Sequence, residues 1–246
     1  MESNLAFGKL PRVLSFPFKG EGAFGKLAIA ALVMLAGMFI PIVPTIFLLG
    51  YIAEVVRNIT VDGKDAEMPA WADWGKLFNE GLKLLGASLV VVLPLTLVFI
   101  VLFALYFIPI MMMSVEGGEE VGMAFMVFLF FIQMITIFFS VIVGFLAGLF
   151  QPIYMAHMLT KGNFGAMFEI GKWWKIFKSA FWEFMIGFVL FFGLAMAASY
   201  VYMLLIYSVV CCCLAPFAIA LIMAYLMLVY AALVAYAYKA GAEKIA

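Results

Sequence analysis

The sequence is poor in the side chains that most often carry chemistry. Its 246 residues include one histidine and three cysteines, and 11% of them are charged, whereas about a quarter of the residues in a soluble domain are charged. A metal site takes several His, Cys or carboxylate ligands, so we expect no metal and no other cofactor. The 14 basic and 14 acidic residues give a net charge of zero, which provides no basis for binding nucleic acid.

What the sequence has instead is long runs without charge. Hydrophobic residues make up 68% of the chain, and the mean hydropathy is +1.21. Residues 27–53, 84–115, 121–156 and 184–238 contain no Asp, Glu, Lys or Arg, and about 20 apolar residues suffice for a helix to cross a bilayer. The pattern predicts an all-α, polytopic membrane protein in which residues 1–246 form a single membrane domain.

The second and third runs each suit one span, and the fourth is long enough for a hairpin of two. We expect that hairpin to turn between Ser208 and Pro216, because proline has no amide hydrogen to continue a helix. The first run is ambiguous, since one straight helix from Leu27 to Val56 would be about 45 Å long against a hydrocarbon core of about 30 Å. Because Pro41 and Pro44 lie at its midpoint, we expect either one kinked span or two short helices that turn back between Phe39 and Thr45.

The charges of the loops favour two helices. Basic residues concentrate in the N-terminal segment, in residues 57–83, in residues 157–183 and at the C-terminus, whereas residues 114–122 carry only acidic charges. Basic loops stay in the cytoplasm, so both termini should be cytoplasmic, which requires an even number of spans. We therefore expect a multi-pass protein of the cell inner (plasma) membrane with six spans, the first hairpin being short; five spans are the alternative.

This topology indicates an internal threefold repeat. Each apolar hairpin follows a short, basic, aromatic-containing segment, and each closes with a tyrosine, one residue and an alanine, at Tyr51, Tyr154 and Tyr230. We interpret residues 1–57, 58–160 and 161–246 as three copies of one unit. Each copy is expected to be an in-plane amphipathic helix followed by a membrane hairpin.

The second and third basic segments carry all five tryptophans, and indole prefers the boundary between lipid and water. A helix from Phe164 would group apolar residues on one face, namely Met167, Ile170, Trp174, Phe177 and Phe181, and charged residues on the other, namely Glu169, Lys172 and Lys175. Residues 71–83 show the same division, with Pro69 in the first helical turn. Such helices lie on a membrane surface and sense its charge, or simply anchor a bundle. The predicted membrane-interface residues are Trp71, Trp74, Lys76, Lys83, Lys172, Trp173, Trp174, Lys175, Lys178 and Trp182.

Several short motifs extend over most of the chain and are moderately specific. They are Ser15-Phe16-Pro17-Phe18-Lys19, Gly50-Tyr51, Arg57-Asn58, the run from Met68 to Phe78, Gly81-Leu82-Lys83, and Phe164-Gly165-Ala166-Met167-Phe168. In these motifs the chain resembles the prokaryotic membrane-protein family catalogued as domain of unknown function 4013. The resemblance implies a membrane fold, and it supplies no catalytic residue because the family has no established activity.

The few reactive side chains are weak candidates for chemistry. His157 has no second histidine to share a metal or haem, so we expect it to cap a helix end or to meet lipid headgroups. The run from Met111 to Met113 could bind copper(I) through thioether sulfur, although methionine is a common filler of apolar packing. Adjacent cysteines on a helix point about 100° apart, so we expect Cys211, Cys212 and Cys213 to be buried, inert thiols; a disulfide or a lipidated thiol is the alternative.

The remaining polar residues suggest packing and solvation. Glu119 and Glu120 resemble the paired glutamates of intramembrane prenyl-protein proteases, but the arginine and the histidines that those enzymes need are missing, so we expect a solvated loop. Glu54 and Arg57, one turn apart, should pair with each other. Four residues of the third run are predicted to pack helices together, through hydrogen bonds or close backbone approach, namely Gln133, Thr136, Gly144 and Gly148.

Spans without ionisable groups can still pack against lipid or other helices. We therefore expect a non-enzymatic integral membrane protein, an accessory or scaffold subunit of a larger membrane complex or a membrane-organising protein. Its expected partners are membrane lipids and either another membrane protein or further copies of itself. The alternative is a transporter or lipid-handling protein with an apolar cargo, and an enzyme ranks last because no nucleophile and base lie at compatible depth.

Overall fold

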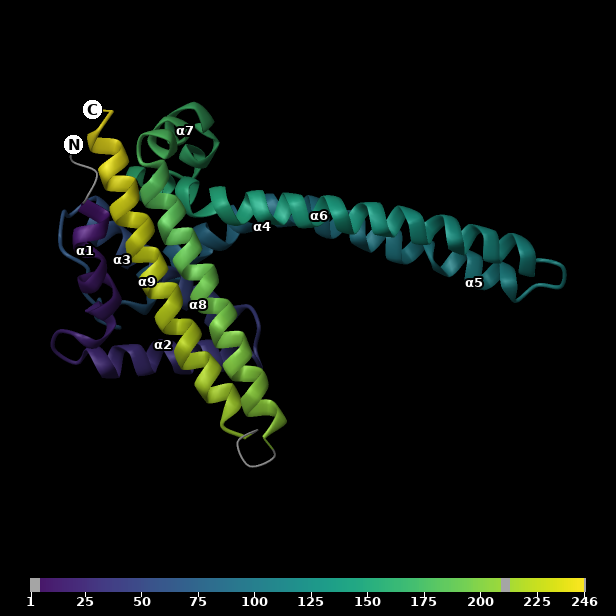
Figure 1. The fold of residues 1–246 in the computed structure, drawn as a ribbon, viewed down its shortest axis with the longest axis horizontal. Helices are drawn as coiled ribbons and strands as arrows, with labels where there is room; N and C mark the ends of the chain where they lie inside the picture. Colours follow the sequence, from purple (N-terminus) through teal and green to yellow (C-terminus); the bar gives the residue numbers. More distant parts are fainter. Residues whose placement is uncertain (1–4, 209–212, 246) are drawn as a thin grey trace. The chain divides into compact units, whose positions relative to one another are not determined.

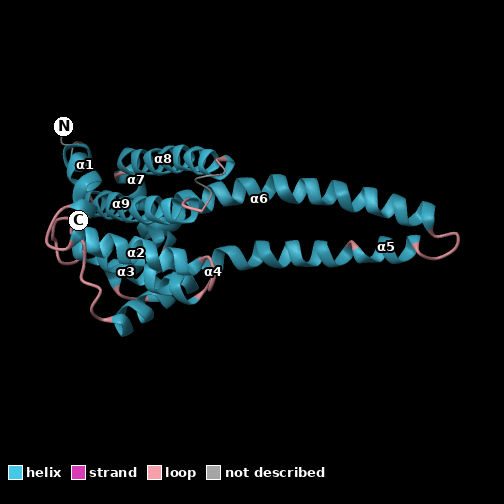
Figure 2. Ribbon diagram, turned by 90° about the horizontal axis from the view of Figure 1, so that it is seen from below, coloured by secondary structure: helices cyan, strands magenta, loops and turns pink. Residues whose placement is uncertain are grey.

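The computed structural model describes residues 5–208 and 213–245, and these are helical with connecting turns and contain no strand, as the uncharged runs predicted. The chain divides into two compact units, one of residues 1–86 with 152–246 and one of residues 87–151. Figure 1 shows the course of the chain and Figure 2 its helical content. Both boundaries between the units fall inside long helices, α4 (Trp74–Leu105) and α6 (Glu119–Lys161).

The first unit begins with α1 (Leu5–Ser15), the short 3-10 helix η1 (Phe16–Phe18), α2 (Ala23–Gly37) and α3 (Val43–Thr60). The break between α2 and α3 confirms the prediction of two helices in this region, and it lies at residues 38–42, slightly earlier than expected. Prolines stand at its end and in the first turn of α3, where a missing amide hydrogen does no harm. With 15 residues, α2 is about 22 Å long, shorter than the hydrocarbon core.

The same unit ends with α7 (Ile170–Ser179), α8 (Phe181–Tyr207) and α9 (Ala215–Glu243). Helices α8 and α9 lie side by side (Figures 1 and 2), as predicted for the last hairpin. Helix α9 is the hub of the unit, because α1, α2, α3, α7 and α8 all contact it. Its buried positions are rich in alanine, including Ala220, Ala224, Ala232 and Ala235, and small side chains allow neighbouring helices to approach closely.

The second unit is a helical hairpin made of α4 from Ala87 onwards, α5 (Phe107–Met113) and α6 as far as Gln151. Along α4 the covered positions recur every three or four residues, at Val91, Leu95, Phe99 and Leu102, while the positions between them are exposed. This spacing is that of a coiled-coil seam, so the two arms cover one narrow stripe of each other. Most other apolar side chains of the unit are exposed.

Among the described residues, five helices are long and apolar enough to cross a membrane, namely α3, the α4–α5 pair, α6, α8 and α9. A sixth candidate is a pair of helices, Gly8–Phe18 and Ala23–Gly37, bent by 77°. The chain is therefore built as a multi-pass helical membrane protein.

The amphipathic segments differ from the prediction in detail. Helix α4 begins at Trp74, not at Pro69, because the Asp73 carboxylate accepts a hydrogen bond from the Lys76 amide at 2.9 Å and caps the first turn. From there α4 runs without a break to Leu105, so residues 71–83 do not form a separate in-plane helix.

The third segment is divided more finely than predicted. It forms a 3-10 helix, η2 (Phe164–Phe168), then α7, and it breaks again at Ala180. The buried face of α7 consists of Trp173, Ile176 and Phe177, whereas Ile170 is 62% exposed. The buried face of α7 therefore lies about one residue away from the face that the sequence predicted to be apolar. The reason is that the end of α9 covers the neighbouring stripe of α7. The threefold repeat stays a prediction.

Candidate functional site

The charged side chains of the first unit gather where segments distant in sequence meet. Arg12 on α1 pairs with Asp65 in the loop after α3 at 2.8 Å, and Lys244 just beyond α9 pairs with Glu183 on α8 at 2.9 Å. Helices α3 and α4 are linked by two such pairs. The basic segments that were predicted to share one side of the membrane thus contact one another directly.

The expected pair of Glu54 with Arg57 is wrong. The Lys76 ammonium lies 3.0 Å from the Glu54 carboxylate, and the Arg57 guanidinium lies 3.1 Å from the Glu80 carboxylate. Both partners come from the first turns of α4, which runs against α3 and offers each charge a partner of opposite sign. Residues one turn apart on a single helix could not reveal this competition.

Two glycines explain how α3 and α4 come so close. A side chain at Gly50 would overlap the backbone of Leu77, and a side chain at Gly81 would overlap the backbone of Ile46. The helices therefore touch backbone to backbone at this crossing. Sequence reasoning missed this role, although both glycines stand in the motifs that carry the family resemblance.

An aromatic stack closes the same corner. The rings of Tyr51 and Trp71 are parallel within 4° with centroids 4.0 Å apart, and the buried Tyr51 hydroxyl donates to the Pro69 carbonyl at 2.8 Å. The Trp71 indole donates to the Lys26 carbonyl at 3.0 Å. Trp71 thus fixes the loop onto α2 and α3, whereas Trp74 packs its ring against Phe47 and remains 44% exposed.

The other predicted interface residues divide in the same way. Trp173 is buried and donates to the Met167 carbonyl at 3.0 Å. Trp174 and Trp182 are exposed, Lys178 lies 5.4 Å from the centre of the Trp174 ring, and Lys175 is exposed beside them. The exposed residues of the predicted interface set remain suited to a membrane surface, whereas Trp71 and Trp173 pack inside the protein.

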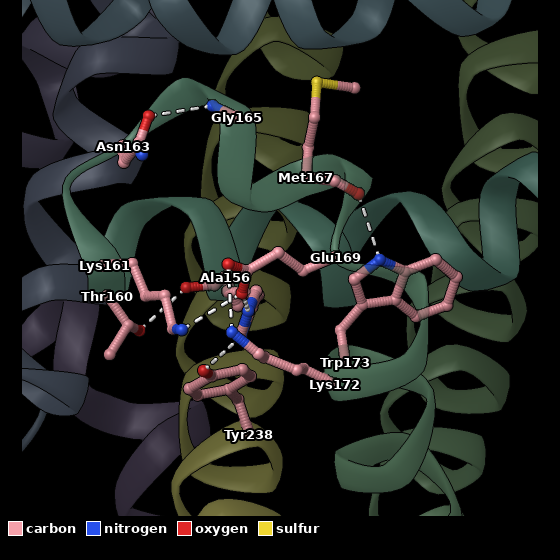
Figure 3. A network of polar contacts seen from close by, with 11 residues as sticks. Ala156, Thr160, Lys161, Asn163, Gly165, Met167, Glu169, Lys172, Trp173 and Tyr238 are labelled. Carbon is pink, nitrogen blue, oxygen red and sulfur yellow. Dashed lines mark hydrogen bonds and ion pairs between the residues drawn. The ribbon is translucent and has the colours of Figure 1, made fainter.

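His157 belongs to a network of polar contacts whose other members include Lys161, Glu169, Lys172 and Tyr238 (Figure 3). Its side chain is 2% exposed, which corrects the expectation of a helix cap or a lipid contact. The ring Nδ1 lies 2.8 Å from the hydroxyl of Tyr238 on α9, and Nε2 lies 3.0 Å from the carboxylate of Glu169 before α7. Because a carboxylate only accepts, Nε2 donates, and in the neutral ring Nδ1 accepts from the Tyr238 hydroxyl.

Three side chains that donate hydrogen bonds contact the Glu169 carboxylate. Besides His157, Lys161 lies 3.0 Å and Lys172 3.1 Å from its two oxygens. Hydrogen bonds from His157 first, and then from the lysines, lower the pKa of Glu169 to about 2. The reciprocal hydrogen bond to Glu169 raises the pKa of Lys172. One turn away, the Thr160 hydroxyl donates to the Thr60 hydroxyl at 3.0 Å, so the network ties α3, α6, α7 and α9 together.

The predicted packing residues lie on α6. Gln133 and Thr136 are half-buried on the seam of the hairpin, and the Thr136 hydroxyl donates to the Ile132 carbonyl within its own helix at 2.9 Å. Between the arms, the Gln151 amide donates to the Ser88 hydroxyl at 3.1 Å. A side chain added at Gly144 would meet nothing within 4 Å, so no other helix approaches closely at that glycine, and Gly148 is half-buried.

The side chains that could bind a metal do not cluster in the part of the chain that the structure describes. It contains no group of three or more His, Cys, Asp or Glu side chains that could hold a metal ion. Met111 is 70% exposed on α5. Cys213 is exposed, not buried as expected, and Cys211 and Cys212 lie outside the described residues.

An open groove of about 820 Å³ lies beside the first turns of α4. It is lined by two of the predicted interface lysines, an acid, an amide and two apolar side chains, namely Lys76, Lys83, Glu80, Asn79, Leu82 and Phe164. Phe164 belongs to η2, and its ring approaches α4 at Gly86. The groove combines donors for an anion with apolar surface.

Comparison with known proteins gives one finding. A family model described as protein of unknown function (DUF4013) matches residues 32–207. No curated protein and no solved structure matches the chain.

Proposed function

This chain belongs to the family of proteins of unknown function DUF4013, and from its own contacts we propose that it is a non-enzymatic accessory or scaffold subunit of a larger membrane assembly. The proposal rests on one contrast between the two units. In the first, the charged residues hold each other in ion pairs across helices. In the second, the helices present apolar side chains outward and cover each other along a single seam.

The outward face of the second unit is the proposed surface for a partner. It carries large aromatic side chains on α6 that are more than half exposed, namely Phe128, Phe130, Phe131, Phe138, Phe139 and Phe145. Gly144 on the same helix is an open position, where an added side chain would meet nothing within 4 Å. In membranes, helices associate by close packing at small residues, so this open glycine suits the approach of another helix.

Photocrosslinking in native membranes tests this role. A benzophenone amino acid at Phe138 or Phe145 should produce a discrete adduct with another protein or a second copy of this chain. The matched control is Tyr200 on α8, which is 68% exposed and should give lipid adducts alone. Lipid adducts alone at all three positions would contradict the proposal.

The runner-up is a lipid-handling protein, and the groove beside α4 supports it, because the groove joins charged and apolar side chains. Transfer of labelled lipid between vesicles that depends on the protein would favour this function over a scaffold. The absence of transfer, together with protein adducts at α6, would favour the scaffold.

A further inference from the structure

We propose that the groove lined by α4 and Phe164 binds the headgroup of an anionic phospholipid, in particular its phosphodiester and the adjoining glycerol. This site is separate from the outward face of α6, so it stands or falls independently of the scaffold role.

The first argument is charge. Three cationic side chains, Arg57, Lys76 and Lys83, meet two carboxylates, Glu54 and Glu80, through ion pairs of 2.9 to 3.1 Å. Within these ion pairs the cations outnumber the carboxylates by one, and a further carboxylate, Asp73, is held by the Lys76 amide at the first turn of α4. A phosphodiester carries one negative charge and would balance the extra cation of the ion pairs.

The second argument is the supply of hydrogen-bond donors. The side chains of Lys76 and Lys83 are 49% and 46% exposed, and an ammonium group has three donors. Each lysine uses one donor on its carboxylate, which leaves others for phosphate oxygens. Asn79 adds an amide to the same groove. The anion therefore need not displace the existing ion pairs.

The third argument separates a lipid from free phosphate. Leu82 and Phe164 line the groove and are 48% and 38% exposed. On α4 the exposed Trp74 and Phe78 continue this apolar strip, because residues four apart lie on one face of a helix. The uncharged run of α4 begins immediately after Lys83. The groove thus lies where headgroups meet acyl chains, and its apolar side suits glycerol and the first methylenes.

The test uses the full-length protein in mild detergent and native mass spectrometry with phosphatidylglycerol. The double variant Lys76→Gln, Lys83→Gln should weaken binding about 30-fold, since each basic residue near the surface contributes about five- to sixfold. The matched control is Lys175→Gln, Lys178→Gln, which removes the same charge from α7 outside the groove and should change affinity by less than about twofold.

A second variant guards against misfolding. Leu82→Glu places a negative charge in the groove at an exposed position and should weaken phosphatidylglycerol binding several-fold more than Leu82→Gln does. Equal losses in the α7 control would show that the surface attracts lipid without a site and would overturn the proposal. Displacement by millimolar inorganic phosphate, or equally tight binding of phosphatidylcholine or phosphatidylethanolamine, would overturn it as well.

Discussion

At the scale of single residues, the buried histidine is the feature that the sequence concealed. His157 is the sole histidine of the chain, and a lone histidine carries no signal of its partners. They come from Tyr238, 81 positions later, and from Glu169, 12 positions later. Such pairings arise from tertiary packing, so the composition gave no sign that His157 joins α6, α9 and the segment before α7.

The substitution His157→Ala should lower the free energy of unfolding by about 2 to 4 kcal/mol, because it leaves a cavity and deprives a buried hydroxyl of its partner. Thermal unfolding in detergent, followed by helical circular dichroism, measures the effect. Lys175→Ala, at an exposed position, should remain within about 0.5 kcal/mol of the wild type. A His157→Ala protein as stable as the wild type would show that the junction contributes nothing.

Glu169 should make stability depend on pH. Its pKa is lowered from 4.5 to about 2 in the folded protein, so its contribution is complete above pH 4.5 and is lost as the pH falls towards 2. Between pH 5 and pH 3 the wild type should therefore lose more thermal stability than Glu169→Gln, which cannot titrate there. Glu67→Gln, at an exposed position, serves as the control and should follow the wild type. Parallel curves for the wild type and Glu169→Gln would refute this assignment.

At the scale of elements, the close crossing of α3 and α4 depends on two glycines, whose lack of a side chain lets the backbones touch. Gly50→Ala or Gly81→Ala would force a methyl group into the backbone of the facing helix, and we expect a loss of about 1 to 3 kcal/mol from such overpacking. Gly144→Ala, at an open helical position, should be neutral or slightly stabilising in the purified protein. Melting temperatures of the three variants test this, and equal effects at all three positions would contradict it.

The sequence predicted the elements better than their contacts. Runs without charge located the helices, and Pro41 and Pro44 indicated the break between α2 and α3. Both signals depend only on the residues of the segment itself, through their hydrophobicity and their backbone hydrogen bonds. The partners of Glu54 and Arg57, and the face of α7 that is buried, depend on which helix lies opposite. A hydrophobic pattern cannot distinguish a face that meets lipid from one that meets α9, since both are apolar.

At the scale of the whole molecule, contacts between the basic segments favour a common side of the membrane. The pairs of Arg12 with Asp65 and of Lys244 with Glu183 join the N-terminal helix, the loop after α3 and the end of α9 to their neighbours. Single cysteines placed at Lys64, Lys175 and Glu243 should therefore react with a membrane-impermeant reagent from the same side, which we expect to be the cytoplasm.

A cysteine at Glu116 should react from the opposite side, because its acidic loop was assigned outside. Spheroplasts and inverted vesicles distinguish the two sides, and each variant is compared with a protein in which the native cysteines are replaced by serine. Labelling of Lys64 and Glu116 positions from the same side would refute the six-span topology.

The central place of α9 has a consequence for biosynthesis. The helices that contact it all precede it in the chain, so during translation they emerge before the surface against which they pack exists. The translocon must hold or shelter these apolar segments until the last hairpin arrives, since chains fold from the N-terminus as they are made. A ribosome that stalls before Ala215 would leave a product without its hub, which membrane proteases should remove quickly.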